Sequence, residues 1–81
     1  MKHVMVGNGT CKVMKETEKA FLLKNDDVAN STVTAWFPKA ALEKQYDVTW
    51  ANGETVTRYE LKSWFFSKAT EEHDVVMGRG L

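Results

Sequence analysis

Four residues, Trp36-Phe37-Pro38-Lys39, constrain the fold most, because they combine the end of a strand with the start of a helical turn. The run 32–37 alternates and is rich in β-branched and aromatic side chains, which favours a strand. Pro38, the only proline, lacks an amide hydrogen for a ladder and fits the first position of a helical turn. Residues 39–44 then favour helix over one or two turns. The segment predicts a small β-domain with short helical insertions.

Turn signals divide the remaining chain into further short strands. Gly7-Asn8-Gly9 and Asn52-Gly53 both favour tight turns, and alternating segments flank each of them. The alternation predicts strands at 2–6, 10–15, 20–24, 46–50 and from 54 or 55 to about 61. Within 46–50 it places Tyr46, Val48 and Trp50 on one face.

The last twenty residues change character. The period of two is lost after residue 62, and better helix formers appear up to Glu72. The pattern predicts a helix of two or three turns beginning at Lys62 or Ser63, although Trp64-Phe65-Phe66 could instead extend the strand. Residues 77–81 form a terminal segment that we expect to be mobile.

These elements indicate a mainly β fold. Five to six short strands, a helical turn after Pro38 and a short C-terminal helix favour a strongly bent antiparallel sheet or an SH3-like or OB-like barrel. Curling the sheet also limits edges that would recruit other chains. All 81 residues are expected to form one barrel-like domain, 1–81.

Composition restricts the compartment and the chemistry. Cys11 is the only cysteine, so a disulfide within the chain is impossible, which fits a reducing cytosol. Neither a signal peptide nor a membrane span is apparent, so we expect a cytoplasmic protein that does not act at a membrane. Isolated His3 and His73 provide no zinc-binding spacing, so neither a metal nor another cofactor is expected.

No catalytic pattern is present either. Cys11 paired with a histidine could in principle act as a nucleophile, but no orienting or oxyanion motif accompanies it. Its place on an alternating strand favours a buried structural thiol. We therefore expect a protein that is not an enzyme.

The aromatic residues point to a binding surface. They exceed what one face of so small a core needs, and neighbours such as Trp36 and Phe37 cannot enter the same side of a sheet. Either the short helices cover the second face, or large apolar side chains remain exposed for a partner. The predicted binding residues are Trp36, Lys39, Arg58, Tyr59, Trp64 and Phe65.

Charge leaves a nucleic-acid alternative open. Eleven basic and eleven acidic residues give a net charge of zero, so the chain as a whole is not attracted to phosphate. Residues 1–24 nevertheless carry five lysines against two glutamates. In this alternative, Lys12, Lys15 and Lys19 flank an aromatic platform that binds single-stranded DNA or RNA.

Three segments resemble a group of small phage and prophage proteins with the patterns KAxLL…xWxPKS and xxPxWLAxKKGL. They are 19–23, 36–40 and 61–68, although Ala40 replaces the usual serine and Lys62 replaces a proline. The resemblance implies an accessory protein in a bacterial host cell and carries over no catalytic residue. It favours a binding module that docks on and inhibits or modulates a host or phage complex, such as a defence or nucleic-acid-processing machine, with homo-oligomers also possible.

Overall fold

The structure, a computed structural model, describes residues 2–27 and 31–78 and is built mainly of strands. The strands are β1 (His3–Val6), β2 (Gly9–Glu16), β3 (Ala20–Asn25), β4 (Thr34–Pro38), β5 (Leu42–Thr49) and β6 (Thr55–Leu61). Two 3-10 turns, η1 (Lys39–Ala41) and η2 (Ser63–Phe65), and one helix, α1 (Glu71–Val76), complete the chain. The mainly β class, the strand number, the turn after Pro38 and the short C-terminal helix are confirmed.

The six strands form one mixed sheet in the order β4-β3-β2-β1-β6-β5. Every neighbouring pair is antiparallel except β1 and β6, which run parallel with Val4 opposite Thr57 and Val6 opposite Tyr59. The sequence pattern had predicted an antiparallel sheet throughout. The difference arises because the chain leaves β4 for the opposite edge of the sheet and returns through β6 beside β1.

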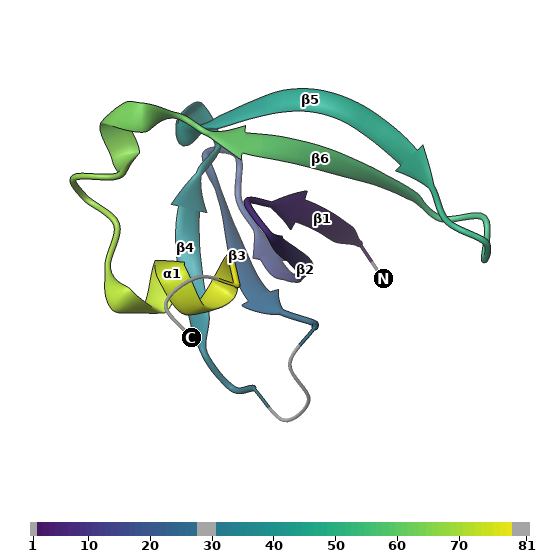
Figure 1. The fold of residues 1–81 in the computed structure, drawn as a ribbon, viewed down its shortest axis with the longest axis horizontal. Helices are drawn as coiled ribbons and strands as arrows, with labels where there is room; N and C mark the ends of the chain where they lie inside the picture. Colours follow the sequence, from purple (N-terminus) through teal and green to yellow (C-terminus); the bar gives the residue numbers. More distant parts are fainter. Residues whose placement is uncertain (1, 28–30, 79–81) are drawn as a thin grey trace.

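The connection from β4 to β5 forces the sheet to curl. These two strands are the edges of the sheet, yet only the three residues of η1 join them. Five interstrand spacings of about 4.8 Å would separate the edges by about 24 Å in a flat sheet, whereas three residues span at most about 11 Å. Figure 1 shows β5 and β6 arching over the other strands. Among the described residues no ladder joins β4 to β5, so the curled sheet is not a closed barrel.

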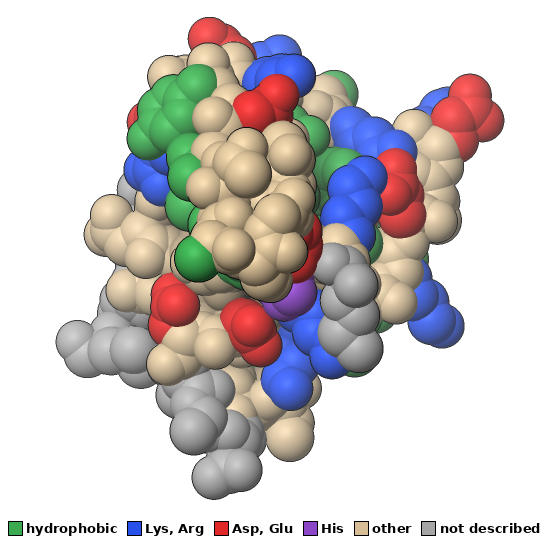
Figure 2. Space-filling view, turned by 90° about the vertical axis from the view of Figure 1, so that its right-hand side faces the viewer, with side chains coloured by type: hydrophobic (Ala, Val, Ile, Leu, Met, Phe, Trp, Pro, Cys, Tyr) green, Lys and Arg blue, Asp and Glu red, His purple; other side chains and the backbone are tan. Residues whose placement is uncertain are grey.

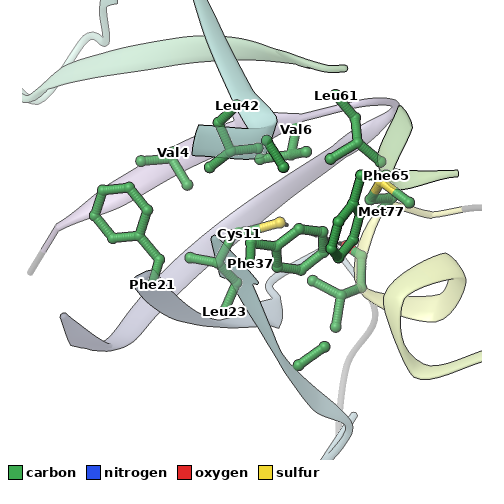
Figure 3. Packing of buried hydrophobic residues seen from close by; sticks show 13 residues of the cluster. Val4, Val6, Cys11, Phe21, Leu23, Phe37, Leu42, Leu61, Phe65 and Met77 are labelled. Atoms are coloured by element: carbon green, nitrogen blue, oxygen red, sulfur yellow. Dashed lines mark hydrogen bonds between the residues drawn. The ribbon is translucent and has the colours of Figure 1, made fainter. Parts of the chain in front are cut away.

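Alternate side chains of the curled sheet fill its inner face. In Figure 3, Phe37 lies between Leu23 and Phe65, while Phe21 lies toward one end of the cluster and Met77 toward the other. The rings of Phe37 and Phe65 are 6.3 Å apart. The buried cluster comprises Val4, Val6, Cys11, Phe21, Leu23, Ala35, Phe37, Ala41, Leu42, Leu61, Phe65, Val76 and Met77.

Both predicted helical segments are shorter than expected. After Pro38 the helix stops at Ala41, because Leu42 is buried opposite Leu61 as the first residue of β5. The C-terminal helix does not begin at residue 62 or 63; a 3-10 turn there precedes α1, whose N-cap is Thr70. The expected mobility at the chain end is wrong for Met77, which is fully buried, while 79–81 lie outside the described residues.

A buried polar contact fixes the end of α1 to the sheet. Asn25, 1% exposed, donates from Nδ2 to the Val76 carbonyl at 2.9 Å, and the Cys11 thiol approaches the same oxygen at 3.4 Å. Gly9 allows this approach, because a Cβ there would lie 2.8 Å from the Val76 oxygen. The end of α1 at Val76 therefore packs directly against the sheet backbone, and a larger residue at position 9 would push it away.

Asn25→Ala tests this contact. The change leaves the Val76 carbonyl without its buried amide donor, and we expect the free energy of unfolding to fall by about 2–3 kcal/mol. Asn52→Ala is the matched control, because both side chains accept a hydrogen bond from the amide two residues later at 2.8 Å, but Asn52 is exposed. In this control, the free energy of unfolding should fall by only about 0.5–1 kcal/mol. Urea unfolding followed by tryptophan fluorescence measures both, and equal losses would contradict the assigned role.

Candidate functional site

The structure distributes the predicted binding residues over separate surfaces. Trp36 and Trp64 are 45% and 47% exposed, on β4 and η2 respectively. Phe65 lies in the core, and Tyr59 is partly buried against it. Arg58 lies on the opposite face of β6 from Tyr59, because successive side chains of a strand alternate. The set predicted from sequence is therefore not one continuous surface.

Lys39 belongs to an ionic cluster at the rim of the sheet. Its Nζ lies 2.7 Å from Glu16 Oε2, and Lys2 Nζ lies 3.0 Å from Oε1 of the same carboxylate. Both ammonium groups also lie over the Phe21 ring, at 4.8 and 5.2 Å from its centroid. The cluster covers the ring of Phe21, a core residue. Lys39 is thus already occupied by contacts within the chain.

Glu16 makes the stability of this rim depend on pH. Hydrogen bonds from Lys39 and then Lys2 hold the pKa of the Glu16 carboxyl below its usual range. A carboxyl with a lower pKa in the folded state stabilises the fold above its unfolded pKa and loses that contribution as pH falls. We expect Glu16→Gln to reduce stability at neutral pH and to flatten its decline in acid. Thermal unfolding from pH 7 to pH 3 measures this, with Glu18→Gln as control; parallel profiles for the wild type and Glu16→Gln would contradict it.

Cys11 is unsuited to nucleophilic chemistry. The side chain is fully buried, and burial, reinforced by Asp27, raises the pKa of its thiol to about 12. The thiol is therefore protonated at neutral pH, and the thiolate is the reactive form. The prediction of a buried thiol is confirmed.

A thiol reagent tests this burial directly. At pH 8, we expect an aromatic disulfide reagent to leave the native protein unmodified over a period in which the urea-unfolded protein reacts with one equivalent, because folding both protonates and covers the sulfur. Release of the coloured thiolate measures the reaction. Equal rates in the two states would contradict the assignment.

The two histidines are held by structural contacts. His73 Nε2 donates to the Trp36 carbonyl at 2.8 Å, and its Nδ1 accepts the Thr70 amide at 2.9 Å, so the ring ties α1 to edge strand β4. His3 lies between Glu54 (2.9 Å) and Asp26 (3.4 Å) and packs on Trp50. Among residues 2–27 and 31–78 no group of three potential ligands could hold a metal ion, and the surface has no pocket.

The outer face of the sheet gathers several basic residues. Lys12 lies directly opposite Lys24, and Lys15 lies opposite Leu22. These side chains face away from the core, because Cys11, Leu23 and their alternating neighbours face inward. We call Lys12, Lys15, Lys24, Leu22 and Trp36 the outer basic face.

An aromatic ring completes this face. Trp36 lies opposite Leu22 on the neighbouring strand and shares its face of the sheet. The β-bulge between Val13 and Lys15 accommodates Met14 as an extra residue and thereby turns Lys15 to the same side as Lys12. Trp36, Lys12 and Lys15 were predicted from sequence as members of two rival sites, and the structure brings them onto one face.

Two lysines differ from the prediction made from sequence. Lys24 was not predicted as a binding residue, because only the register of β2 and β3 shows that it lies opposite Lys12. The signal in the sequence was its position two residues after Leu22 in an alternating strand, which places both side chains on one face. Lys19, by contrast, lies in the turn between β2 and β3, where its carbonyl accepts the Lys39 amide. Lys19 thus belongs to the rim and not to the outer basic face.

Arg58 and Tyr46 extend the same side of the sheet. Arg58 lies opposite Met5 on β1 and opposite Tyr46 on β5, and Tyr46 is exposed. Acidic residues bound the surface: Asp26 and Glu54 flank His3 beside Lys12, and Glu43 lies opposite Glu60 farther along β5 and β6. The positive charge is therefore local.

The basic residues of this side lack acidic partners. Among the ion pairs between described residues, none includes Lys12, Lys15, Lys24 or Arg58, whereas Lys2, Lys39 and Lys44 each contact a carboxylate. Directly opposed like charges destabilise a sheet. Figure 2 shows basic and acidic side chains interspersed on the face that it presents. Two pairs of like charge among the described residues lie directly opposite each other, Lys12 with Lys24 on β2 and β3 and Glu43 with Glu60 on β5 and β6. The lysine pair is the one that lies on the outer basic face.

Comparisons with protein-family models, curated proteins and solved structures found no match to this chain. In the described part of the chain, no helix combines the length and the apolar character needed to cross a membrane. The functional interpretation therefore depends on the geometry of the outer face.

Proposed function

We propose that this protein is a non-catalytic binding module that docks through its outer basic face on a partner carrying negative charge. The observation that supports it is the direct opposition of Lys12 and Lys24 next to a half-exposed tryptophan. Folding gains nothing from placing two like charges across a ladder, whereas an anionic partner turns that cost into binding energy.

Exposed aromatic side chains support the same proposal. Tryptophan is enriched among residues that dominate binding energy, and Trp36 lies on the sheet face that the inner core leaves uncovered. The buried contacts of Phe37, the next residue, hold the backbone of Trp36 in place, and His73 fixes its carbonyl. The ring is thus presented on a rigid strand, which lowers the entropy cost of binding.

The proposal includes the kind of cell and the kind of complex in which the protein acts. The three segments that resemble phage and prophage proteins suggest an accessory protein that acts in a bacterial cytoplasm on a host or phage complex and inhibits or modulates it. Segments 19–23 and 36–40 include parts of β3, β4 and η1, and they carry Leu22 and Trp36 of the outer basic face. A protein of this kind needs no catalytic group, since occupying a surface is sufficient for inhibition.

Affinity capture from bacterial lysate, with and without nuclease, tests the function. Two variants matched in residue type separate the surfaces: Trp36→Ala with Lys24→Gln alters the outer basic face, and Trp64→Ala with Lys68→Gln alters η2, where Lys68 lies 5.5 Å from the Trp64 ring. We expect one dominant component, protein or nucleic acid, to be retained by the wild type and the η2 variant and lost by the outer-face variant.

The reverse pattern, with loss only in the η2 variant, would show that docking uses the second exposed tryptophan. Retention by both variants, or no enrichment over a blank resin, would also overturn the proposal. Circular dichroism of both variants excludes unfolding as the cause, because each replaced side chain is at least partly exposed.

A further inference from the structure

We infer that the partner of the outer basic face is a single-stranded nucleic acid, bound with its phosphates on the lysines and a base stacked on Trp36. The inference rests on the proposed function and names its ligand class. The ligand class is one polyanion, because DNA and RNA share the phosphates and bases that this face would contact.

The arrangement of charge fits a phosphate chain. Lys12, Lys15 and Lys24 lie on two adjacent strands, and Arg58 lies on β6, two strands beyond β2. With a spacing of about 4.8 Å between strands, β3 and β6 are about 14 Å apart across the sheet. Cations distributed over such a width can follow several phosphates, whereas a single carboxylate would engage one or two. The spread favours a polymeric anion.

The tryptophan distinguishes a single strand from a duplex. Trp36 is 45% exposed on a strand that begins at Thr34 and ends at Pro38, and it lies opposite Leu22. Bases of a single strand offer their faces to such a ring, and stacking contributes irrespective of sequence. In a duplex the faces are stacked on one another and unavailable, so Trp36 would contribute little. Direct readout of a duplex also requires an element that enters a groove, and this face is a sheet surface.

Acidic residues define the extent of the site. Asp26 and Glu54 lie against His3 at one boundary, and Glu43 and Glu60 lie at the other end of the β5–β6 pair. These carboxylates repel a phosphate chain and restrict it to β2, β3 and β4, with Arg58 at its margin. The site is short, about four nucleotides, at the lower end of the range for small single-strand-binding domains.

Fluorescence anisotropy with labelled oligothymidine and oligouridine of about 12 nucleotides, and with a duplex of the same length, tests the inference. If three lysines neutralise three phosphates, the slope of log affinity against log salt is about −2 for a single strand. Affinity should then fall roughly 20-fold between about 50 and 200 mM salt. We expect both single strands to bind and to compete, and the duplex to bind at least about tenfold more weakly.

Two outer-face variants separate charge from stacking. Lys12→Gln with Lys24→Gln removes two phosphate contacts, so the slope should become shallower by about 1.4. Trp36→Ala should weaken single-strand binding about tenfold and leave the slope unchanged. Lys44→Gln with Lys68→Gln removes the same charge elsewhere and should change neither quantity. Quenching of tryptophan fluorescence on binding, lost in Trp36→Ala, reports the stacking independently.

Equal affinity for the duplex, an unchanged slope in the lysine variant, or no binding at low salt would overturn the nucleic-acid inference. If oligonucleotides do not bind but a nuclease-resistant protein is captured through Trp36 and Lys24, the proposed function stands and its ligand is a protein. If neither is bound, both proposals are wrong.

Discussion

The short connection between the two edge strands determines the rest of this structure. Because η1 spans only three residues, β4 and β5 must approach each other at one corner, and the sheet must curl. Pro38 is the last residue of β4, opposite Ala20, and the small side chain of Ala41 is fully buried in the turn that follows. Curling creates an inner face with room for one dense cluster. Among the described residues, no second layer of helices or strands covers the outer face.

The open end of the curled sheet is sealed by the end of α1. Val76 and Met77 are fully buried, and the Val76 carbonyl receives the Asn25 amide and the Cys11 thiol at a point where Gly9 leaves space. A helix of six residues is too short to be stable alone. Its order therefore depends on packing, on the capping contacts of Thr70 and on the His73 bridge to β4. Val76 and Met77 thus complete the core.

Sequence patterns predicted most of the strands, because alternation and turn chemistry are local. The hairpin around Asn52-Gly53 and the shared face of Tyr46 and Val48 are confirmed, since each depends on neighbouring residues alone. The parallel pairing of β1 with β6 and the burial of Met77 could not be predicted this way, because both depend on contacts between residues far apart in the chain. The same limit explains the candidate site: Lys12 and Trp36 were identified singly, and only the register of β2, β3 and β4 joins them with Lys24.

The division between the two faces of the sheet connects the fold to its proposed role. On the inner face, the buried polar group Asn25 is satisfied, and no buried side-chain nitrogen or oxygen among the described residues lacks a partner. On the outer face, the partly exposed Lys12 and Lys24 oppose each other across β2 and β3. A fold that satisfies its interior in this way can carry repulsive pairs at its surface, such as Lys12 with Lys24 and Glu43 with Glu60, since each costs less than about 1 kcal/mol. In the proposed complex with a single strand, phosphate contacts and base stacking would more than offset that surface cost.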